Sequence, residues 1–117
     1  MQTLPYEIKD QIIQCFGRCF YYKDTVEAFL RSTGVSRELA NKYKNEAKFV
    51  WARKILTELE DSEEGLLIQR RILTELCKLR NVPDEVPDRD LGLEALRQLK
   101  ALANDYNIEY QEERKNV

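Results

Sequence analysis

Apolar residues recur every three or four positions along most of the chain, which is the spacing of an amphipathic helix. No stretch of four or more residues alternates between apolar and polar with an enrichment in β-branched residues, so we expect no sheet. The pattern predicts helices over about 5–20, 24–33, 36–44, 46–59, 66–79 and 88–106. The third and fourth of these either separate at Asn45 or run on as one helix.

Residues suited to helix ends support these boundaries. Asp24, with Glu27 three positions later, forms the pattern of a capping box at the start of the second helix. Gly34 is suited to the left-handed conformation that ends many helices. Ser36 and Asp88 are candidate N-caps of the third and the last helix, and a loop with two prolines precedes Asp88.

The predicted helices differ in the width of their apolar faces. In the first helix the inner residues are expected to be Ile8, Ile12, Cys15, Phe16 and Cys19. In the fourth they are Phe49, Ala52, Ile55, Leu56 and Leu59, with Val50 and Trp51 widening the stripe. In the fifth they are Ile68 or Gln69, Ile72, Leu73, Leu76 and Leu79, and the last helix carries Leu91, Ala95, Leu96, Leu99, Leu102, Ala103 and Tyr106. The wide stripe makes 46–59 the candidate central helix.

The composition agrees with a small folded helical domain. The chain has 117 residues, of which 43% are hydrophobic and 34% charged, and it contains only 4 Gly and 3 Pro. This balance supports a real core and argues against disorder. We therefore predict an all-α fold, a compact bundle of five to six helices over residues 1–107, with residues 108–117 as a charged tail or the start of a linker.

Several classes of chemistry are excluded or disfavoured. The chain has no His, which excludes Ser/His and Cys/His catalysis and any metal site that contains His. Cys15, Cys19 and Cys77 are an odd number without a secretion signal, which indicates reduced core thiols in a cytoplasmic protein. No apolar run approaches the ~20 residues that span a bilayer. We expect no cofactor, no metal, no small-molecule substrate and no membrane partner.

Basic and aromatic residues alternate in the middle of the chain. The basic residues of this strip are Lys42, Lys44, Lys48, Arg53 and Lys54, and they surround Tyr43, Phe49 and Trp51. Such a strip, with Arg70 and Arg71 added, is a candidate contact for nucleic acid or for a protein partner, because cations bind phosphates and rings stack on bases. The alternative is a solvated helix face over core aromatics.

Charge is distributed in sectors, although the total is only −2. Residues 23–59 carry eight basic and five acidic side chains, and residues 66–81 carry four basic and one acidic. Residues 60–65 carry four acidic side chains, and residues 82–117 carry nine acidic and five basic. Opposed sectors favour head-to-tail contacts between like domains or docking on a charged partner, and they also suit ordinary solubility.

One short pattern is typical of metal-dependent nucleases, namely Pro87-Asp88 followed by Glu113 and Lys115. In those enzymes the acids and the lysine surround Mg²⁺ on adjacent strands. Because Asp88 is predicted to cap a helix and Glu113 belongs to a charged tail, we do not assign a catalytic role to these residues.

Three segments carry a resemblance to a known family: 48–59 (KFVWARKILTEL), 65–79 (GLLIQRRILTELCKL) and 86–90 (VPDRD). They are similar to an N-terminal helical region of bacterial proteins that continue into a restriction-endonuclease-like domain of the PD-(D/E)xK, Mrr-like kind. The resemblance covers about residues 5–105 and implies an accessory domain of a prokaryotic defence or restriction protein, with the nuclease downstream. In size and helix count the chain also resembles death-fold adaptor modules, which pair with their own kind.

These observations predict a non-enzymatic interaction module that associates with itself or recruits a protein partner. The alternative is a DNA-binding accessory domain that uses the basic and aromatic strip. Catalysis by the chain itself is the least favoured possibility.

Overall fold

The structure is a computed structural model that describes residues 1–108. This part of the chain forms six α-helices joined by short segments. They are α1 (Tyr6–Arg18), α2 (Lys23–Ser32), α3 (Arg37–Lys42), α4 (Lys48–Leu59), α5 (Glu63–Lys78) and α6 (Arg89–Asp105). Residues 1–108 contain no strand, so the predicted all-α bundle is confirmed. Of the predicted charged tail, residues 109–117 lie outside the described part of the chain.

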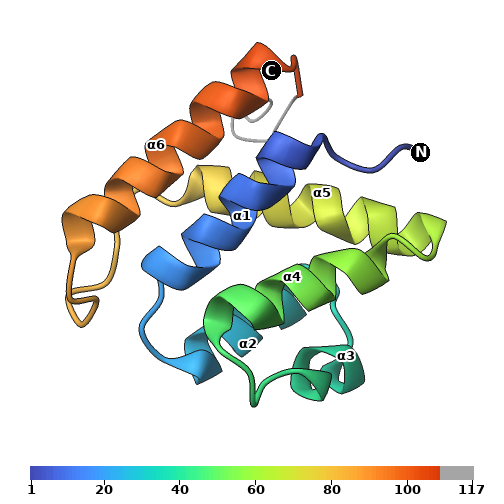
Figure 1. Ribbon diagram of the computed structural model, residues 1–117, viewed down its shortest axis with the longest axis horizontal. Helices are drawn as coiled ribbons and strands as arrows, with labels where there is room; N and C mark the ends of the chain where they lie inside the picture. The colour runs from blue at the N-terminus through green and yellow to red at the C-terminus, as the bar shows by residue number, and fades with distance from the viewer. Residues whose placement is uncertain (109–117) are drawn as a thin grey trace.

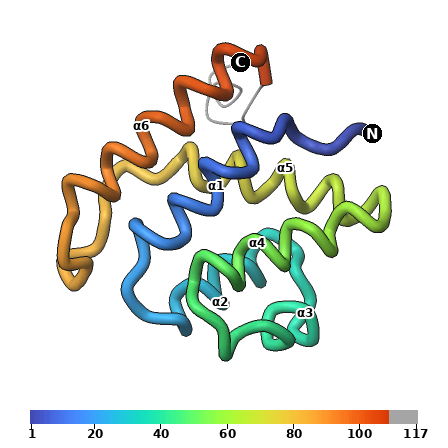
Figure 2. Tube along the Cα trace, viewed as in Figure 1, coloured from blue at the N-terminus to red at the C-terminus, as the bar shows by residue number. Residues whose placement is uncertain are grey.

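Helix α1 is the central element of the bundle. It runs between α6 and α4, and α5 crosses behind it (Figures 1 and 2). It packs against all three of these helices, whereas α2 and α3 form an angular pair next to α4. The prediction that 46–59 is the central helix is therefore wrong, because α1, which has a narrower apolar stripe, is the helix that touches most of the others.

The core contains most of the residues that the helical pattern selected. All five predicted inner residues of α1 are buried, as are Ala52, Ile55, Leu56 and Leu59 of α4. The rings of Phe16, Phe20 and Phe29 pack together with centroid separations of 5.5–5.7 Å. Trp51 is fully buried, and its indole Nε1–H donates a hydrogen bond of 2.9 Å to the carbonyl oxygen of Ala40. This bond joins α4 to α3.

The helix starts confirm two predicted caps and correct a third. Ser36 accepts a hydrogen bond from the Leu39 N–H, and Asp88 accepts one from the Leu91 N–H, each at 3.1 Å. The capping box at Asp24 is wrong, because α2 begins at Lys23 and no side chain caps it. The carboxylates that suggested the box bind a lysine instead, as described below.

Helix α5 starts three residues earlier than predicted. Ser62 is its N-cap and accepts a hydrogen bond of 2.9 Å from the Gly65 N–H. The acidic turn therefore belongs partly to the helix, with Glu63 and Glu64 in its first turn, where the positive end of the helix dipole favours them.

Gly34 ends α2 in the predicted manner. Its φ of 112° lies in the left-handed region, which a residue without Cβ adopts readily. The Val35 N–H then bonds to Leu30 O and the Gly34 N–H to Arg31 O, both at 3.1 Å, which is a Schellman motif. The buried side chains of Leu30 and Val35 complete it, and α3 follows at once.

A buried amide fastens the N-terminal segment to the bundle. Gln69 and Ile68 are both buried, which settles the choice that the pattern left open. The Gln69 Oε1 accepts a hydrogen bond of 3.2 Å from the Leu4 N–H, and its Nε2 donates to Leu56 O at 3.2 Å and to Glu60 at 3.0 Å. A buried polar group is stable only when bonded, and here one side chain joins three segments.

Two glycines let α1 approach its neighbours closely. A Cβ added to Gly17 would lie 2.2 Å from the ring of Phe49 on α4. A Cβ added to Gly92 of α6 would lie 2.9 Å from the carbonyl oxygen of Arg18. Both distances are shorter than carbon and oxygen atoms tolerate, so a larger residue at either position would push a helix or a ring aside.

We predict that Trp51→Ala lowers the free energy of unfolding by about 3–5 kcal/mol, because it empties a fully buried site. Trp51→Phe keeps most of the ring and loses the bond to Ala40, and it should cost less. Urea unfolding followed by circular dichroism measures both. A loss below about 1 kcal/mol for Trp51→Ala would contradict the burial described here.

We also predict that the effect of Gly17→Ala depends on Phe49. In the native chain the added methyl must displace the ring, at a cost of about 1–3 kcal/mol. In a Phe49→Ala background the same change should be stabilising by up to about 1 kcal/mol, because Ala favours the helix more than Gly does. Urea unfolding of the four chains tests this, and equal effects in both backgrounds would disprove the contact.

Candidate interaction surface

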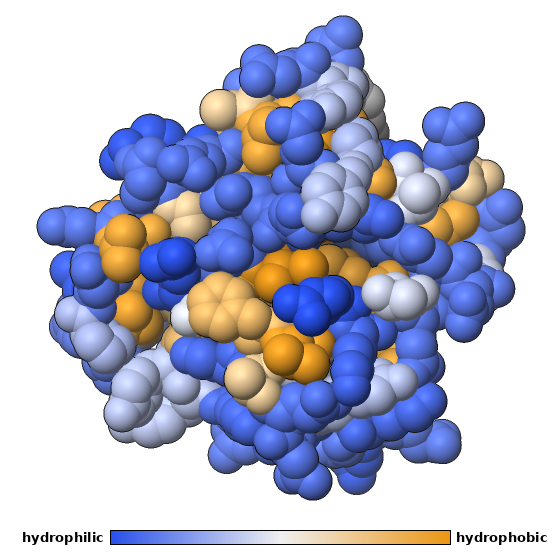
Figure 3. Space-filling model, viewed as in Figure 1, coloured by the Kyte–Doolittle hydropathy of each residue, from blue (hydrophilic) through white to orange (hydrophobic). Residues whose placement is uncertain are grey.

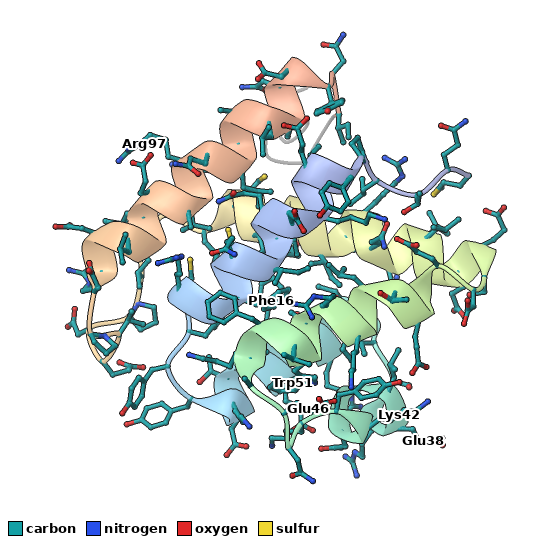
Figure 4. All side chains as sticks on the ribbon, in the orientation of Figure 1. Phe16, Glu38, Lys42, Glu46, Trp51 and Arg97 are labelled. Atoms are coloured by element: carbon teal, nitrogen blue, oxygen red, sulfur yellow. The ribbon has the colours of Figure 1, made fainter. Side chains whose placement is uncertain are left out.

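The lysines of the basic strip are held by other groups of the same molecule. Lys42 Nζ lies 2.9 Å from Glu58 and Lys54 Nζ lies 2.6 Å from Glu46. Figure 4 shows Lys42 on α3 at the edge of the molecule. Lys48 donates to the carbonyl oxygen of Phe20, across the start of α2. These side chains are therefore engaged within the molecule and do not form an open cationic surface.

Lys44, in the segment between α3 and α4, connects this segment to α2 through the carboxylates that suggested the capping box. Its Nζ lies 2.6 Å from Asp24 and 2.7 Å from Glu27, both on α2. The hydrogen bonds with Asp24 and then Glu27 raise the pKa of Lys44 above its ordinary 10.5. The bond from Lys44 is also the main cause that lowers the pKa of Asp24 below 3.8 and that of Glu27 below 4.5.

Burial lowers the pKa of Lys48, and the positive charge of Lys23 lowers it further. The opposite holds for Lys42, whose pKa is raised by its hydrogen bond with Glu58. Neither lysine resembles a solvated phosphate ligand, because one is partly withdrawn from water and the other is neutralised by a carboxylate.

The arginines of the predicted set are separated in the fold. Arg53 is exposed on α4 and lines a hollow of about 260 Å³ between α1 and α4, together with Tyr6, Ile13 and Leu56. Arg70 donates to Gln2 O at 3.1 Å, and Arg71 lies against the α2–α3 turn, with Nη1 3.5 Å from Thr33 O. The predicted contact residues thus do not converge on one site.

The aromatic residues of the strip are not placed for stacking on bases. Trp51 is fully buried, which agrees with the alternative of a solvated helix face over core aromatics. The Tyr43 hydroxyl bonds to Glu58, and the ammonium groups of Lys42 and Lys54 lie 5.4 and 5.3 Å from its ring centroid. Binding of nucleic acid stays a prediction that this geometry does not favour.

The cysteines and acids of the described residues form no metal centre. Cys15, Cys19 and Cys77 are buried and form no disulfide with one another, and the hydrogen bond with Cys19, followed by burial, raises the pKa of the Cys15 thiol well above 9.0. Within residues 1–108, no three His, Cys, Asp or Glu side chains gather as metal ligands would. Of the nuclease-like pattern, Asp88 caps a helix, and Glu113 and Lys115 lie outside the described residues.

A different surface emerges at the corner where α1 turns into α2. Tyr21 and Tyr22 are 49% and 55% exposed, and their rings meet edge to face at 4.9 Å. The bonds of Lys48 to Phe20 O and, at 3.5 Å, to Tyr21 O hold this corner beside the start of α4. Two adjacent aromatic rings are therefore presented to solvent on a fixed piece of backbone.

An open hollow of about 390 Å³ adjoins the start of α4. It is lined by Gly17, Arg18, Phe49, Val86, Pro87, Asp88 and Leu91. Leu91 is 46% exposed, so its prediction as an inner residue is wrong, as is that of Tyr106, whose hydroxyl bonds to Glu7. Figure 3 shows apolar surface at the edge of this face near the α5–α6 loop and again over the seam between α1 and α4.

We call the surface formed by Tyr21, Tyr22, Phe49, Pro87 and Leu91 the aromatic patch. Exposed aromatic and apolar groups that gather from distant parts of a chain mark interaction sites more often than scattered ones do. Tyr and Phe are also enriched at the cores of protein interfaces. The patch is thus the best candidate contact surface among residues 1–108.

An acidic loop borders the aromatic patch. Residues 84–90 hold four carboxylates, Asp84, Glu85, Asp88 and Asp90, and one guanidinium, Arg89, which is a net charge of −3. Arg89 is engaged locally, since its Nε donates to Val82 O at 2.9 Å and lies 3.8 Å from Asp84. The loop therefore presents negative charge next to apolar groups.

The sequence pattern did not single out this surface. Tyr21 and Tyr22 directly follow the predicted first helix, which covers about 5–20. Their position was a usable signal, because consecutive aromatic residues at a helix end, followed by Lys23 and Asp24, cannot all face one core. The contributions of Phe49 and Leu91 depend on how three helices and a loop meet, and no local pattern contains that information.

Comparison of the chain with models of protein families, with curated proteins and with solved structures found no significant match. In the described part of the chain, every helix is too short or too polar to cross a lipid bilayer.

We predict that Lys44→Met raises the pKa of Asp24 and Glu27 towards 3.8 and 4.5, because it removes the cation that stabilises both carboxylates. A lowered folded-state pKa contributes stability above the unfolded-state pKa, and this contribution is lost as the pH falls through the lowered value. The variant should therefore lose less stability than the native chain on acidification below about pH 4.5.

Carboxyl titration by NMR and urea unfolding at a series of pH values measure these effects. Lys54→Met is the matched control, because it removes the partner of Glu46 and leaves Asp24 and Glu27 bonded. Unchanged titration of Asp24 and Glu27 in Lys44→Met would show that Lys44 is free in solution and available to a ligand.

Proposed function

We propose that this chain is a non-enzymatic helical interaction module, an accessory domain of a prokaryotic defence or restriction protein. In this proposal the aromatic patch is the contact surface, and it binds either a second copy of the chain or another protein. The patch carries the proposal, because it exposes Tyr21, Tyr22 and Leu91, and because the partly buried Phe49 lines the hollow of about 390 Å³ together with Leu91. The attached effector would supply any catalysis.

The physical case rests on the contrast between the patch and the rest of the surface. The lysines of the basic strip and several other charged side chains pair with carboxylates or with carbonyl groups, as Lys9 does with Glu60 at 2.8 Å. Paired surface charges contribute little to stability and are already satisfied, so they offer a partner little. Exposed rings gain free energy on contact, because association removes their apolar area from water.

The resemblance to helical regions that precede restriction-endonuclease-like domains supports the same role. An accessory domain of this kind needs a rigid scaffold and a surface, and it needs no active site. Contact through the patch would bring attached effectors together or bring an effector to its target.

We predict that Tyr22→Ser combined with Leu91→Ser weakens association by about tenfold or more, because large apolar groups near the centre of an interface carry most of its binding energy. Leu67→Ser is the matched control, since Leu67 on α5 is 43% exposed, close to the 46% of Leu91, and lies outside the patch. The control should behave like the native chain.

Two measurements cover the two kinds of partner. Light scattering at rising protein concentration reports self-association, and retention of proteins from a lysate of the source cells on immobilised chain reports recruitment. Circular dichroism confirms that both variants fold. If the native chain associates with nothing in either assay, or if the patch variant associates as well as the control does, the proposed function is wrong.

A further inference from the structure

Three arginines from three helices surround the turn between α2 and α3. Arg31 lies in the last turn of α2, Arg37 is the first residue of α3, and Arg71 reaches the turn from α5. All three are exposed, and the only carboxylate of the turn and α3 is Glu38. We call these three residues the arginine corner.

The arginine corner is positive, although Glu38 follows Arg37 in the chain and Glu75 lines a small hollow with Arg71. No ion pair joins Arg31, Arg37 or Arg71 to a carboxylate of residues 1–108. This distinguishes them from Lys42, Lys44 and Lys54, which are all paired. Guanidinium groups form planar, bidentate contacts with carboxylates, so this corner is suited to an acidic partner surface.

Another hollow lies beside the arginine corner. It has a volume of about 630 Å³ and is lined by Ser36, Glu38, Leu39, Asn41, Lys42 and Glu58. Its lining combines the apolar side chain of Leu39 with hydroxyl, amide, ammonium and carboxylate groups. A tyrosine side chain matches such a lining, because its ring is apolar and its hydroxyl both donates and accepts hydrogen bonds.

The arginine corner and the acidic loop that borders the aromatic patch carry opposite charge. The patch has two exposed tyrosines and a bordering loop of net charge −3, whereas the corner lies beside a hollow and has three arginines that form no ion pair within residues 1–108. The α5–α6 loop and α3 lie on different sides of the molecule, at left and at lower right in Figure 1. One chain therefore carries both halves of a possible contact and cannot bring them together within itself.

We propose that the partner of the aromatic patch is a second copy of this chain, which presents its arginine corner in a head-to-tail contact. The acidic loop of one copy meets Arg31, Arg37 and Arg71 of the next, and the tyrosines enter the hollow along α3. Because the two surfaces differ, each dimer leaves one of each free, so the contact propagates into longer assemblies or closes into a ring. This inference rests on the proposed function.

Nucleic acid fits these surfaces less well than a second copy does. The acidic loop would repel phosphates, so the patch and the loop together favour a basic protein surface. The arginine corner alone provides three cations, of which only Arg71 belongs to the set first considered for DNA.

Reversal of charge on each surface tests the contact. The head variant carries Asp84→Lys and Glu85→Lys, and the tail variant carries Arg31→Glu and Arg37→Glu. Asp88 and Arg71 stay unchanged, because Asp88 caps α6 and Arg71 bonds to Thr33. Sedimentation velocity of the purified full chain at low salt measures the average mass as the concentration rises.

The native chain should self-associate, and added salt should weaken that association. Each single-surface variant should bind itself about tenfold or more weakly, because like charges then face each other. The chain with all four substitutions should associate again, because the two charges are exchanged across the contact. An equimolar mixture of the head and tail variants should also associate.

A matched control carries Asp61→Lys and Glu64→Lys at the turn between α4 and α5. It changes the net charge by the same amount as the head variant does and touches neither surface, so it should associate like the native chain. Circular dichroism and thermal unfolding of every variant separate loss of contact from loss of fold.

Three results would overturn the inference: a native chain that stays monomeric at all concentrations, single-surface variants that associate normally, or a fourfold variant that fails to recover. Failure of the proposed function gives a different outcome. If the native chain is monomeric but retains a protein from the lysate, and Tyr22→Ser with Leu91→Ser abolishes that retention, the head-to-tail contact is wrong and the interaction module stands.

Discussion

The packing of α1 between α6 and α4 is the constraint on which the rest of the structure depends. It requires a close approach on two sides of the same helix end, at Gly17 towards Phe49 and at Arg18 towards Gly92. The Cys19 thiol bonds to Gly92 O at 3.3 Å in the same place. Once α1 is fixed there, the α1–α2 corner and the start of α4 are brought next to the α5–α6 loop, which creates the aromatic patch.

The charged residues show why a basic stretch of sequence is a weak guide to a ligand. Lys44 and Lys48 reach back across the fold to α2 and to the α1–α2 corner, where they bond to carboxylates and carbonyl groups. The gain in each bond is modest, but an unpaired charge in a half-buried position would be costly. The same lysines that suggested a phosphate contact therefore connect distant segments of the fold: Lys44 bonds to α2, and Lys48 bonds to the α1–α2 corner.

A module of this kind would work through preorganisation. The tyrosines sit on backbone held by Lys48, and Phe49 is fixed over Gly17, so little conformational entropy remains to be lost on docking. A rigid aromatic surface beside a charged loop gives both binding energy and orientation, since the rings supply buried area and the charges select the partner. Neither the binding energy nor the orientation of the partner requires a catalytic group.

The sequence by itself determined the helical class, most of the core and three helix ends, because these depend on side-chain spacing and local hydrogen bonds. The periodic stripe of α1, the caps at Ser36 and Asp88 and the left-handed Gly34 are all of this local kind. Only the tertiary structure decided that α1 is central, that Lys44 binds Asp24 and that Leu91 is exposed. These outcomes arise from contacts between residues far apart in the chain, and such contacts leave no periodic trace in the sequence.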